Sequence, residues 1–153
     1  MTEWHLAQLN LARIRHPLDD PRMAGFVDNL DRINLLGEES PGFVWRYQDE
    51  SGAATETRAF DDDDVLINLT VWESVDDLRA YVVDSEHVNF LRRRLEWFDR
   101  VGDLPVITMW WIPAGTVPTT EEAVERCRHL QDHGPSERAF TFKDRFAPPG
   151  TTV

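Results

Sequence analysis

The sequence predicts an α+β fold with a ferredoxin-like βαββαβ order and an antiparallel sheet, extended by a C-terminal helix and a short strand. Three observations support this class. Four segments alternate their side chains with the period of a strand, three others pair a helix-capping residue with helical periodicity, and these segments occur in the required order. The 153 residues are 41% hydrophobic, which is enough for one core. We expect a single domain over residues 1–146 and a flexible tail over 147–153.

The first strand and the first helix are expected in the N-terminal quarter of the chain. Residues 3–12, EWHLAQLNLA, alternate in a way that leaves both sides of a strand partly apolar. Asp20-Pro21 is an N-cap followed by proline at the first helical position, and the helix it starts runs to Gly37. Its buried stripe holds Met23, Phe26, Val27, Leu30 and Ile33. Asn34 falls in that stripe by angle, so one amide faces the core side.

Two strands and a helix pair are expected next. The strands are residues 42–48 and 65–72, with an acidic loop at 61–64 between them. Ser74 and Asp77 have the spacing of a capping box, which starts a helix. A second capping residue at Asp84-Ser85 indicates that this helix breaks there before continuing as residues 85–100.

The last elements are a strand, a helix and a short strand. Residues 105–112, PVITMWWI, predict the fourth strand. Thr119 with Glu122 caps a helix that ends near Gly134, and residues 139–142, AFTF, predict the short final strand. His129 and His133 on that helix have a spacing that could hold zinc, but histidines in a last helical turn also favour the helix dipole, which is the interpretation we prefer.

The segment 85–100, SEHVNFLRRRLEWFDR, places two polar side chains among apolar ones. At about 100° per residue, one arc of this helix is apolar, with Val88, Phe90, Leu91, Leu95, Trp97, Phe98 and Val101. His87 and Arg94 lie seven residues apart near the centre of that arc, whereas Arg92 and Arg93 face the opposite side. We therefore expect His87 and Arg94 on the buried side, where an unpaired guanidinium needs a carboxylate, a carbonyl or a ligand anion.

The strands predict a homodimer. In residues 65–72 and around Trp110 and Trp111, both alternating sets of side chains are largely apolar, so neither sheet face reads as a solvent face. If helices cover one face, the other needs a partner, and a second copy of the chain is the simplest one.

The composition excludes several classes of partner. A formal charge of −12 argues against nucleic acid and against an anionic membrane surface. No segment is as apolar as a membrane span, the N-terminus lacks a signal-peptide layout, and the single cysteine permits no internal disulfide, so we expect a cytoplasmic protein.

The runs SPGFVWRY (40–47), LTVWESVDDLRAYV (69–82), SEHVNFLRRRLEWF (85–98), MWWIPAGTVPTTEEAVER (109–126) and AFTF (139–142) resemble a bacterial family known as domain of unknown function 3291. The resemblance covers nearly the whole chain. It implies membership of the dimeric α/β-barrel proteins, which are similar to antibiotic-biosynthesis monooxygenases, haem-degrading monooxygenases, isomerases and dehydratases. Haem-degrading members use an asparagine on the first strand, a tryptophan and a histidine on the second helix. The resemblance therefore points to Asn10 or Gln8, to Trp72 or Tyr81, and to His87.

We interpret His87 as a base or ligand and Arg94 as an anion clamp, in a small-molecule pocket whose expected wall is Asn10, Gln8, Asn34, Asn68, Trp72, Tyr81, Phe90, Leu91 and Phe98. The leading hypothesis is a cofactor-free, monooxygenase-like enzyme that oxygenates a hydrophobic aromatic or polyketide-like substrate, or rearranges it by proton transfer. Two alternatives stay open: a haem protein or haem enzyme with His87 as the iron ligand, and a non-catalytic ligand-binding or assembly module. A structural role for both side chains, with Arg94 reaching the rim and His87 bonded to a carbonyl, also stays open.

Overall fold

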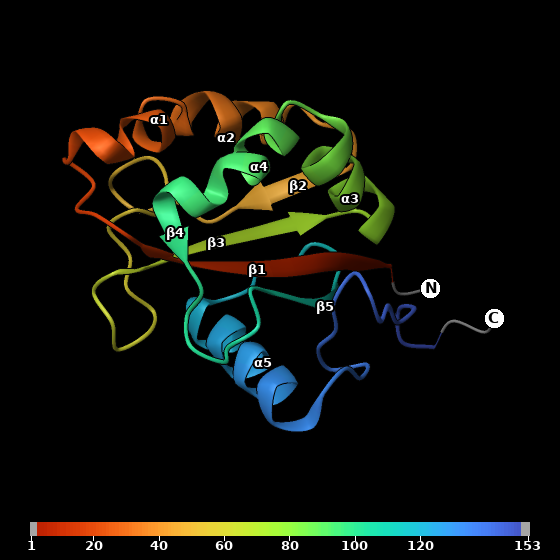
Figure 1. The fold of residues 1–153 in the computed structure, drawn as a ribbon. Helices are drawn as coiled ribbons and strands as arrows, with labels where there is room; N and C mark the ends of the chain where they lie inside the picture. The colour runs from red at the N-terminus through yellow and green to blue at the C-terminus, as the bar shows by residue number, and fades with distance from the viewer. Residues whose placement is uncertain (1–2, 151–153) are drawn as a thin grey trace.

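The sheet is built around β1 (Trp4–Ile14) in a computed structural model that describes residues 3–150 (Figure 1). β1 pairs with β3 (Val65–Trp72) on one side and with β5 (Ile107–Pro113) on the other, and β2 (Phe43–Arg46) lies outside β3. All of these pairings are antiparallel. The resulting order, β2-β3-β1-β5, is that of a split βαβ fold. The predicted fold class, α+β with an antiparallel ferredoxin-like sheet, is therefore confirmed.

One face of the sheet carries the helices of the first two thirds of the chain (Figure 1). They are the 3-10 turn η1 (Pro21–Met23), α1 (Ala24–Val27), α2 (Leu30–Glu38), α3 (Val75–Asp84) and α4 (His87–Trp97). The Asp20 side chain caps η1 and the Ser74 hydroxyl caps α3, as predicted. The predicted break between α3 and α4 is also present.

The prediction of one helix from Pro21 to Gly37 is wrong, because the helix is interrupted at Asn29. In a continuous helix the Asn29 N–H would bond the carbonyl of Gly25. Instead the Asn29 side-chain Nδ2 donates to that carbonyl at 2.9 Å, and the backbone N–H shifts to the carbonyl of Phe26. The side chain has thus displaced the backbone donor, which is how asparagine interrupts helices.

The other face of the sheet is covered by α5 (Thr120–His133), which lies below the sheet in Figure 1. Ala123 and Cys127 of α5 join a core that also contains Leu9, Leu69 and Trp110 of the strands. These side chains are almost fully buried within one chain. The argument that this face needs a second copy is therefore wrong, because the C-terminal helix supplies the cover. The homodimer itself stays a prediction.

Two short segments differ from their predictions. Residues 139–142 form no strand, since only single bridges join Met109 to Phe140 and Ser136 to Ala139 before the chain bends. The helix expected to continue through residue 100 ends at Trp97, and Phe98–Asp99 form a two-residue strand, β4, beside Arg13 and Ile14 of β1.

The C-terminal segment contacts the sheet as far as Phe146, whose carbonyl accepts a 2.8 Å hydrogen bond from the Trp111 indole N–H. The predicted domain over 1–146 and tail over 147–153 stay predictions, and residues 151–153 lie outside the described part of the chain. Within residues 3–150, no helix has the length and apolar character needed to cross a membrane.

Candidate functional site

A cavity of about 620 Å³ lies between the β1–β3 part of the sheet and helices α2, α3 and α4. Most of its lining is apolar, and polar groups come from both the sheet and the helices. Every residue predicted for the site borders this one cavity: Gln8, Asn10, Asn34, Asn68, Trp72, Tyr81, His87, Phe90, Leu91, Arg94 and Phe98. The structure thus brings the predicted residues together, while their roles in binding or catalysis stay predictions.

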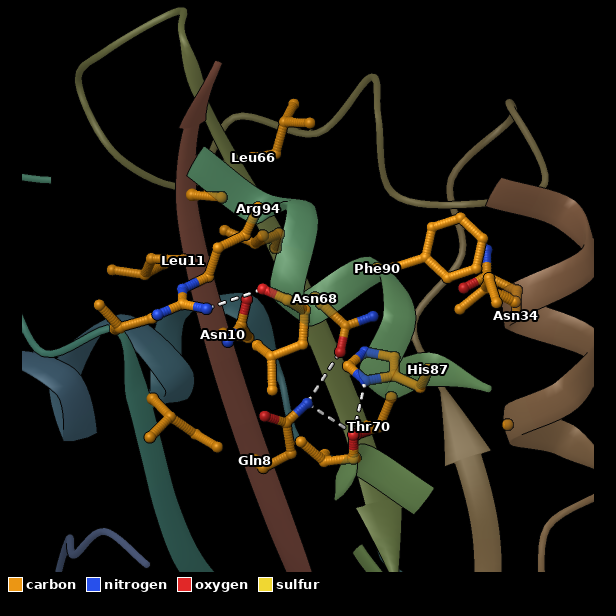
Figure 2. A pocket seen from close by; sticks show the side chains of 18 of the residues that line it. Gln8, Asn10, Leu11, Asn34, Leu66, Asn68, Thr70, His87, Phe90 and Arg94 are labelled. Atoms are coloured by element: carbon orange, nitrogen blue, oxygen red, sulfur yellow. Dashed lines mark hydrogen bonds between the residues drawn. The ribbon is translucent and has the colours of Figure 1, made fainter. Parts of the chain in front are cut away.

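The floor of the cavity is a hydrogen-bonded polar row across β1 and β3 (Figure 2). The Gln8 side-chain Nε2 donates to Asn68 Oδ1 and to Thr70 Oγ1, both at 2.8 Å. The Trp72 indole N–H donates to the same Thr70 oxygen at 2.9 Å. Because a hydroxyl oxygen has two lone pairs, Thr70 is then saturated as an acceptor and keeps its O–H to donate. With the Asn68 amide N–H groups, this row offers hydrogen-bond donors to a ligand.

His87 begins α4 and projects to the cavity with a defined tautomer (Figure 2). Its Nδ1 lies 3.1 Å from the carbonyl oxygen of Val82, and because a carbonyl only accepts, Nδ1 carries the hydrogen. In the neutral ring the lone pair is therefore on Nε2. Burial lowers the pKa of His87, with an opposing effect from the Val82 carbonyl. A neutral imidazole with a free Nε2 can accept a proton or coordinate a metal.

The junction between α3 and α4 creates this arrangement. A helix end leaves its last carbonyls without helical donors. At the end of α3, the Tyr81 carbonyl accepts from the Ser85 hydroxyl and the Val82 carbonyl accepts from His87. The break predicted from the capping residues therefore supplies the carbonyl that orients the imidazole.

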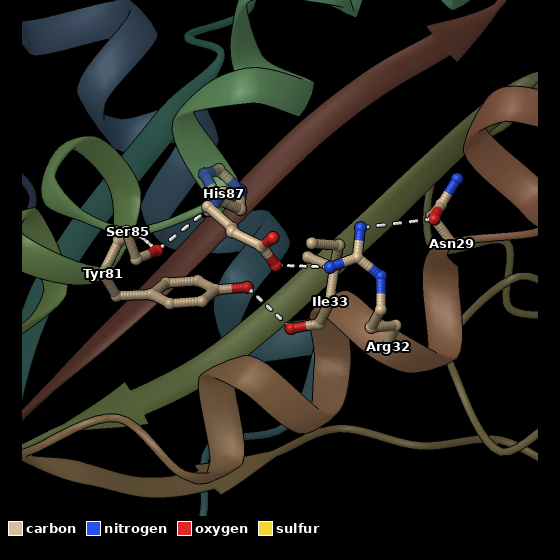
Figure 3. Close-up of polar contacts among 7 residues, drawn as sticks. Asn29, Arg32, Ile33, Tyr81, Ser85 and His87 are labelled. Atoms are coloured by element: carbon tan, nitrogen blue, oxygen red, sulfur yellow. Dashed lines mark hydrogen bonds and ion pairs between the residues drawn. The ribbon is translucent and has the colours of Figure 1, made fainter.

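Tyr81 links the histidine to the floor of the cavity (Figure 3). Its ring centroid lies 4.8 Å from that of His87 and 5.2 Å from that of Trp72. The Tyr81 hydroxyl donates to the carbonyl of Ile33 in α2 at 3.1 Å, and burial raises the pKa of this phenol. Tyr81 therefore stays protonated and fixes α2 and His87 relative to Trp72.

The prediction that Arg94 is buried is wrong within a single chain. Arg94 is exposed and borders the cavity at its rim, where one Nη donates to the carbonyl of Leu91 at 2.7 Å. The next residue, Leu95, was placed in the apolar arc but is 63% exposed. At the C-terminal end of α4, Trp97 is buried, whereas Arg94 and Leu95 face outward.

Several cavity residues were missed by sequence reasoning. Arg79 on α3, Arg100 after β4 and Val106 before β5 border the cavity. Sequence periodicity singled out neither arginine. Thr108 of β5 is buried on the opposite sheet face beside Leu9, its partner across the β1–β5 pairing.

A metal ion needs several ligand side chains that lie close together. Among residues 3–150, no group of three or more histidine, cysteine, aspartate or glutamate side chains could hold a metal ion. The His129 and His133 ring centroids lie 4.5 Å apart.

Comparisons with known proteins identify the family. The model of the family described as domain of unknown function (DUF3291) matches residues 5–153, which confirms the predicted resemblance. No curated protein sequence matches the chain.

Among solved structures, the chain is similar to an asparagine-to-alanine variant of SnoaB, a cofactor-independent oxygenase from Streptomyces nogalater, with 14% identity and a TM-score of 0.48 over 74% of this chain and 95% of that one. A candidate antibiotic biosynthesis monooxygenase from Nitrosomonas europaea is similar at 12% identity and a TM-score of 0.43, over 76% of this chain and 93% of that one. Likenesses this distant do not identify a reaction here.

Proposed function

The chain belongs to the DUF3291 family, and on that premise we propose that it is a small-molecule enzyme that deprotonates a hydrophobic aromatic or polyketide-like substrate at an acidic O–H. The observation that carries this proposal is the neutral His87, with Nδ1 bound to the Val82 carbonyl and Nε2 free, beside a largely apolar cavity.

The polar row explains how the cavity would favour the reaction. His87 Nε2 takes a proton from a phenol or enol, which leaves an oxyanion on the substrate. The Asn68 amide N–H groups and the Thr70 O–H, held by Gln8 and Trp72, donate to that oxyanion. Most of the remaining lining is apolar, which strengthens the interaction of these donors with a charged oxygen. An enolate or phenolate formed in this way can react with dioxygen, or rearrange by returning the proton to another atom.

The proposal is tested with 2-naphthol, a neutral aromatic phenol whose ionised form has its own absorption and fluorescence. We expect the wild-type protein to bind it and to lower the apparent pKa of the bound phenol. His87→Gln should keep binding but lose that shift, because the amide cannot take up the proton. His133→Gln on α5 is the matched control and should behave as the wild type. An equal shift in His87→Gln, or no binding by the wild type, would refute the proposal.

Haem is a second candidate, favoured by one observation. A histidine that ligates iron commonly donates its other ring N–H to a carbonyl, which is the arrangement of His87 and Val82. His87 would hold the iron and Arg94 would pair with a propionate, and the haem would supply oxygen activation or dehydration. Adding hemin should then shift the Soret band in the wild type but not in His87→Ala. An unchanged Soret band in the wild type removes this candidate.

A non-catalytic ligand-binding module is the remaining alternative. It predicts tight binding of 2-naphthol without any change in the phenol's ionisation. The same titration therefore separates it from the enzyme.

A further inference from the structure

The arginines around the cavity indicate what else its ligand carries. We infer that the ligand is an amphipathic aromatic carboxylate, with its carboxylate bound by Arg94 and Arg100 at the mouth and its aromatic body inside. This inference rests on the proposed function, because it names the class of substrate for the same cavity.

The charge around the cavity is opposite to that of the whole chain. The chain has a formal charge of −12, but the charged residues bordering the cavity are Arg46, Arg79, Arg94, Arg100 and a single acid, Asp99. Asp99 is already paired with Arg15 at 2.8 Å. A cationic rim on an acidic protein attracts an anion to this place in particular, since a cleft with walls of low dielectric focuses the field.

Seven of the fifteen arginines of this chain pair with a carboxylate, and those at the mouth do not. Within residues 3–150, ion pairs to aspartate or glutamate are made by Arg13, Arg15, Arg22, Arg32, Arg46, Arg93 and Arg145. In the same residues, no carboxylate lies within ion-pair distance of Arg79, Arg94 or Arg100. Arg94 uses one Nη on the Leu91 carbonyl, which orients the guanidinium and leaves further N–H donors for a carboxylate.

The mouth also suits the apolar part of such a ligand. Leu95 is 63% exposed and Val106 is 39% exposed, and both border the cavity together with Arg94 and Arg100. A helix C-terminus ordinarily disfavours an anion, but here donors fill two of the last carbonyls of α4: Arg15 N–H bonds the Trp97 carbonyl and Phe98 N–H bonds that of Arg94. Cations beside exposed aliphatic side chains match a molecule that is charged at one end.

The spacing along α4 sets the shape of the ligand. His87 and Arg94 are seven residues apart, which is two helical turns or about 10 Å. The acidic O–H that meets His87 and the carboxylate that meets Arg94 should therefore lie at opposite ends of a fused-ring molecule. Arg79 on α3 is the competing position for the carboxylate, and the variants below distinguish the two positions.

The probe for this inference is 6-hydroxy-2-naphthoic acid, which has a phenol at one end and a carboxylate at the other, compared with its uncharged carboxamide. Fluorescence titration of the wild type should show the acid binding about tenfold more tightly or better than the amide, the value of a charge-assisted contact. Raising the salt concentration should weaken binding of the acid only.

The variants identify the arginines. In the double variant Arg94→Gln, Arg100→Gln, the acid and the amide should bind equally, at the wild-type affinity of the amide. Arg92→Gln, an exposed neighbour that does not border the cavity, and Arg79→Gln should keep the wild-type preference. Equal binding of acid and amide by the wild type, or loss of the preference in Arg79→Gln instead, overturns the inference.

Failure here differs from failure of the proposed function. If 2-naphthol binds and its ionisation depends on His87, but the acid binds no more tightly than the amide, the carboxylate inference is rejected. The role of His87 as a base is then retained. If the acid binds more tightly in an arginine-dependent way but no phenol ionises, the carboxylate inference is retained. The role of His87 as a base is then rejected.

Discussion

The two faces of the same sheet are built for different purposes. On β1, the side chains of Ala7, Leu9 and Leu11 pack into the α5-side core with hardly any exposed area, and Leu11 also borders the cavity. Between them, Gln8 and Asn10 face the opposite side and form part of the cavity floor. β3 repeats the division, with Ile67 and Leu69 in the core and Asn68 and Thr70 on the floor.

The difference shows that alternation along two strands separates stability from chemistry. Because consecutive side chains of a strand point to opposite faces, one residue packs in the core and the next lines the cavity. The α5 face therefore supports the fold, and the face under α2, α3 and α4 is left free to keep a cavity with polar groups inside it.

The largest difference between the two faces is expected when two adjacent residues of β1 are each replaced by alanine. Leu9→Ala should lower the free energy of unfolding by about 2–5 kcal/mol, because Leu9 is 1% exposed and leaves a hole in close packing. Asn10→Ala, one residue on, should change it by less than about 0.5 kcal/mol. Urea unfolding followed by tryptophan fluorescence measures both. Equal losses in the two variants would contradict the division.

A smaller effect is expected within the polar row. Gln8→Ala removes the donor shared by Asn68 and Thr70 and should cost about 1–2 kcal/mol, since both acceptors lose a buried partner. The same urea experiment measures it, with Asn10→Ala as the control on the same strand. A neutral result would mean that the cavity solvates the row, so that water replaces Gln8.

The pH dependence of stability should report on the cavity face. The folded-state pKa of His87 is lowered by burial below its usual value of about 6.5, so the unfolded chain binds the proton more readily. Stability should therefore fall as the pH drops below about 6.5 and continue to fall towards the lower folded pKa, by at most about 1.4 kcal/mol per pH unit for this group.

His87→Gln lacks this titration, and its stability should decline less between the same pH values. Thermal or urea unfolding at a series of pH values makes the comparison, with His133→Gln on the α5 side as the control. Parallel pH curves for wild type and His87→Gln would show that His87 is not held neutral.

The smallest effect on folding is expected at the cavity mouth. Leu95→Asp and Val106→Asp alter exposed side chains and should change monomer stability by about 0.5 kcal/mol or less. If the predicted homodimer uses this exposed apolar patch, each substitution should convert dimer to monomer in size-exclusion chromatography with light scattering. A wild-type monomer would rule out the homodimer, and dimers in both variants would move its interface elsewhere.

Much of the fold could be predicted because its signals are local. Asp20, Ser74 and Thr119 cap helices through contacts within three residues, and the alternation in 65–72 identifies β3 with its bounds. The break at Asn29 was missed because it depends on whether the backbone N–H or the side-chain amide of Asn29 bonds the Gly25 carbonyl. β4 was missed because two residues have no period of their own.

The membership of the site was predictable for a related reason. Asn10, Asn68 and His87 are polar residues inside apolar patterns, and such residues gather wherever those patterns face a common space. The exposure of Arg94 depends instead on how α4 lies against the sheet, and a helical wheel gives no information about that packing. The cover supplied by α5 is likewise a tertiary fact, since its own sequence says only that one side is apolar.

The joint between α3 and α4 has a consequence for comparing relatives of this protein. The Val82 carbonyl is available to His87 only because α3 ends at Asp84 and α4 begins at His87, with two residues between them. A relative that keeps the histidine but loses or gains a residue in this joint would lose the contact that fixes the imidazole proton on Nδ1. The length of the joint, as much as the histidine itself, is therefore the mark by which shared chemistry can be recognised across the family.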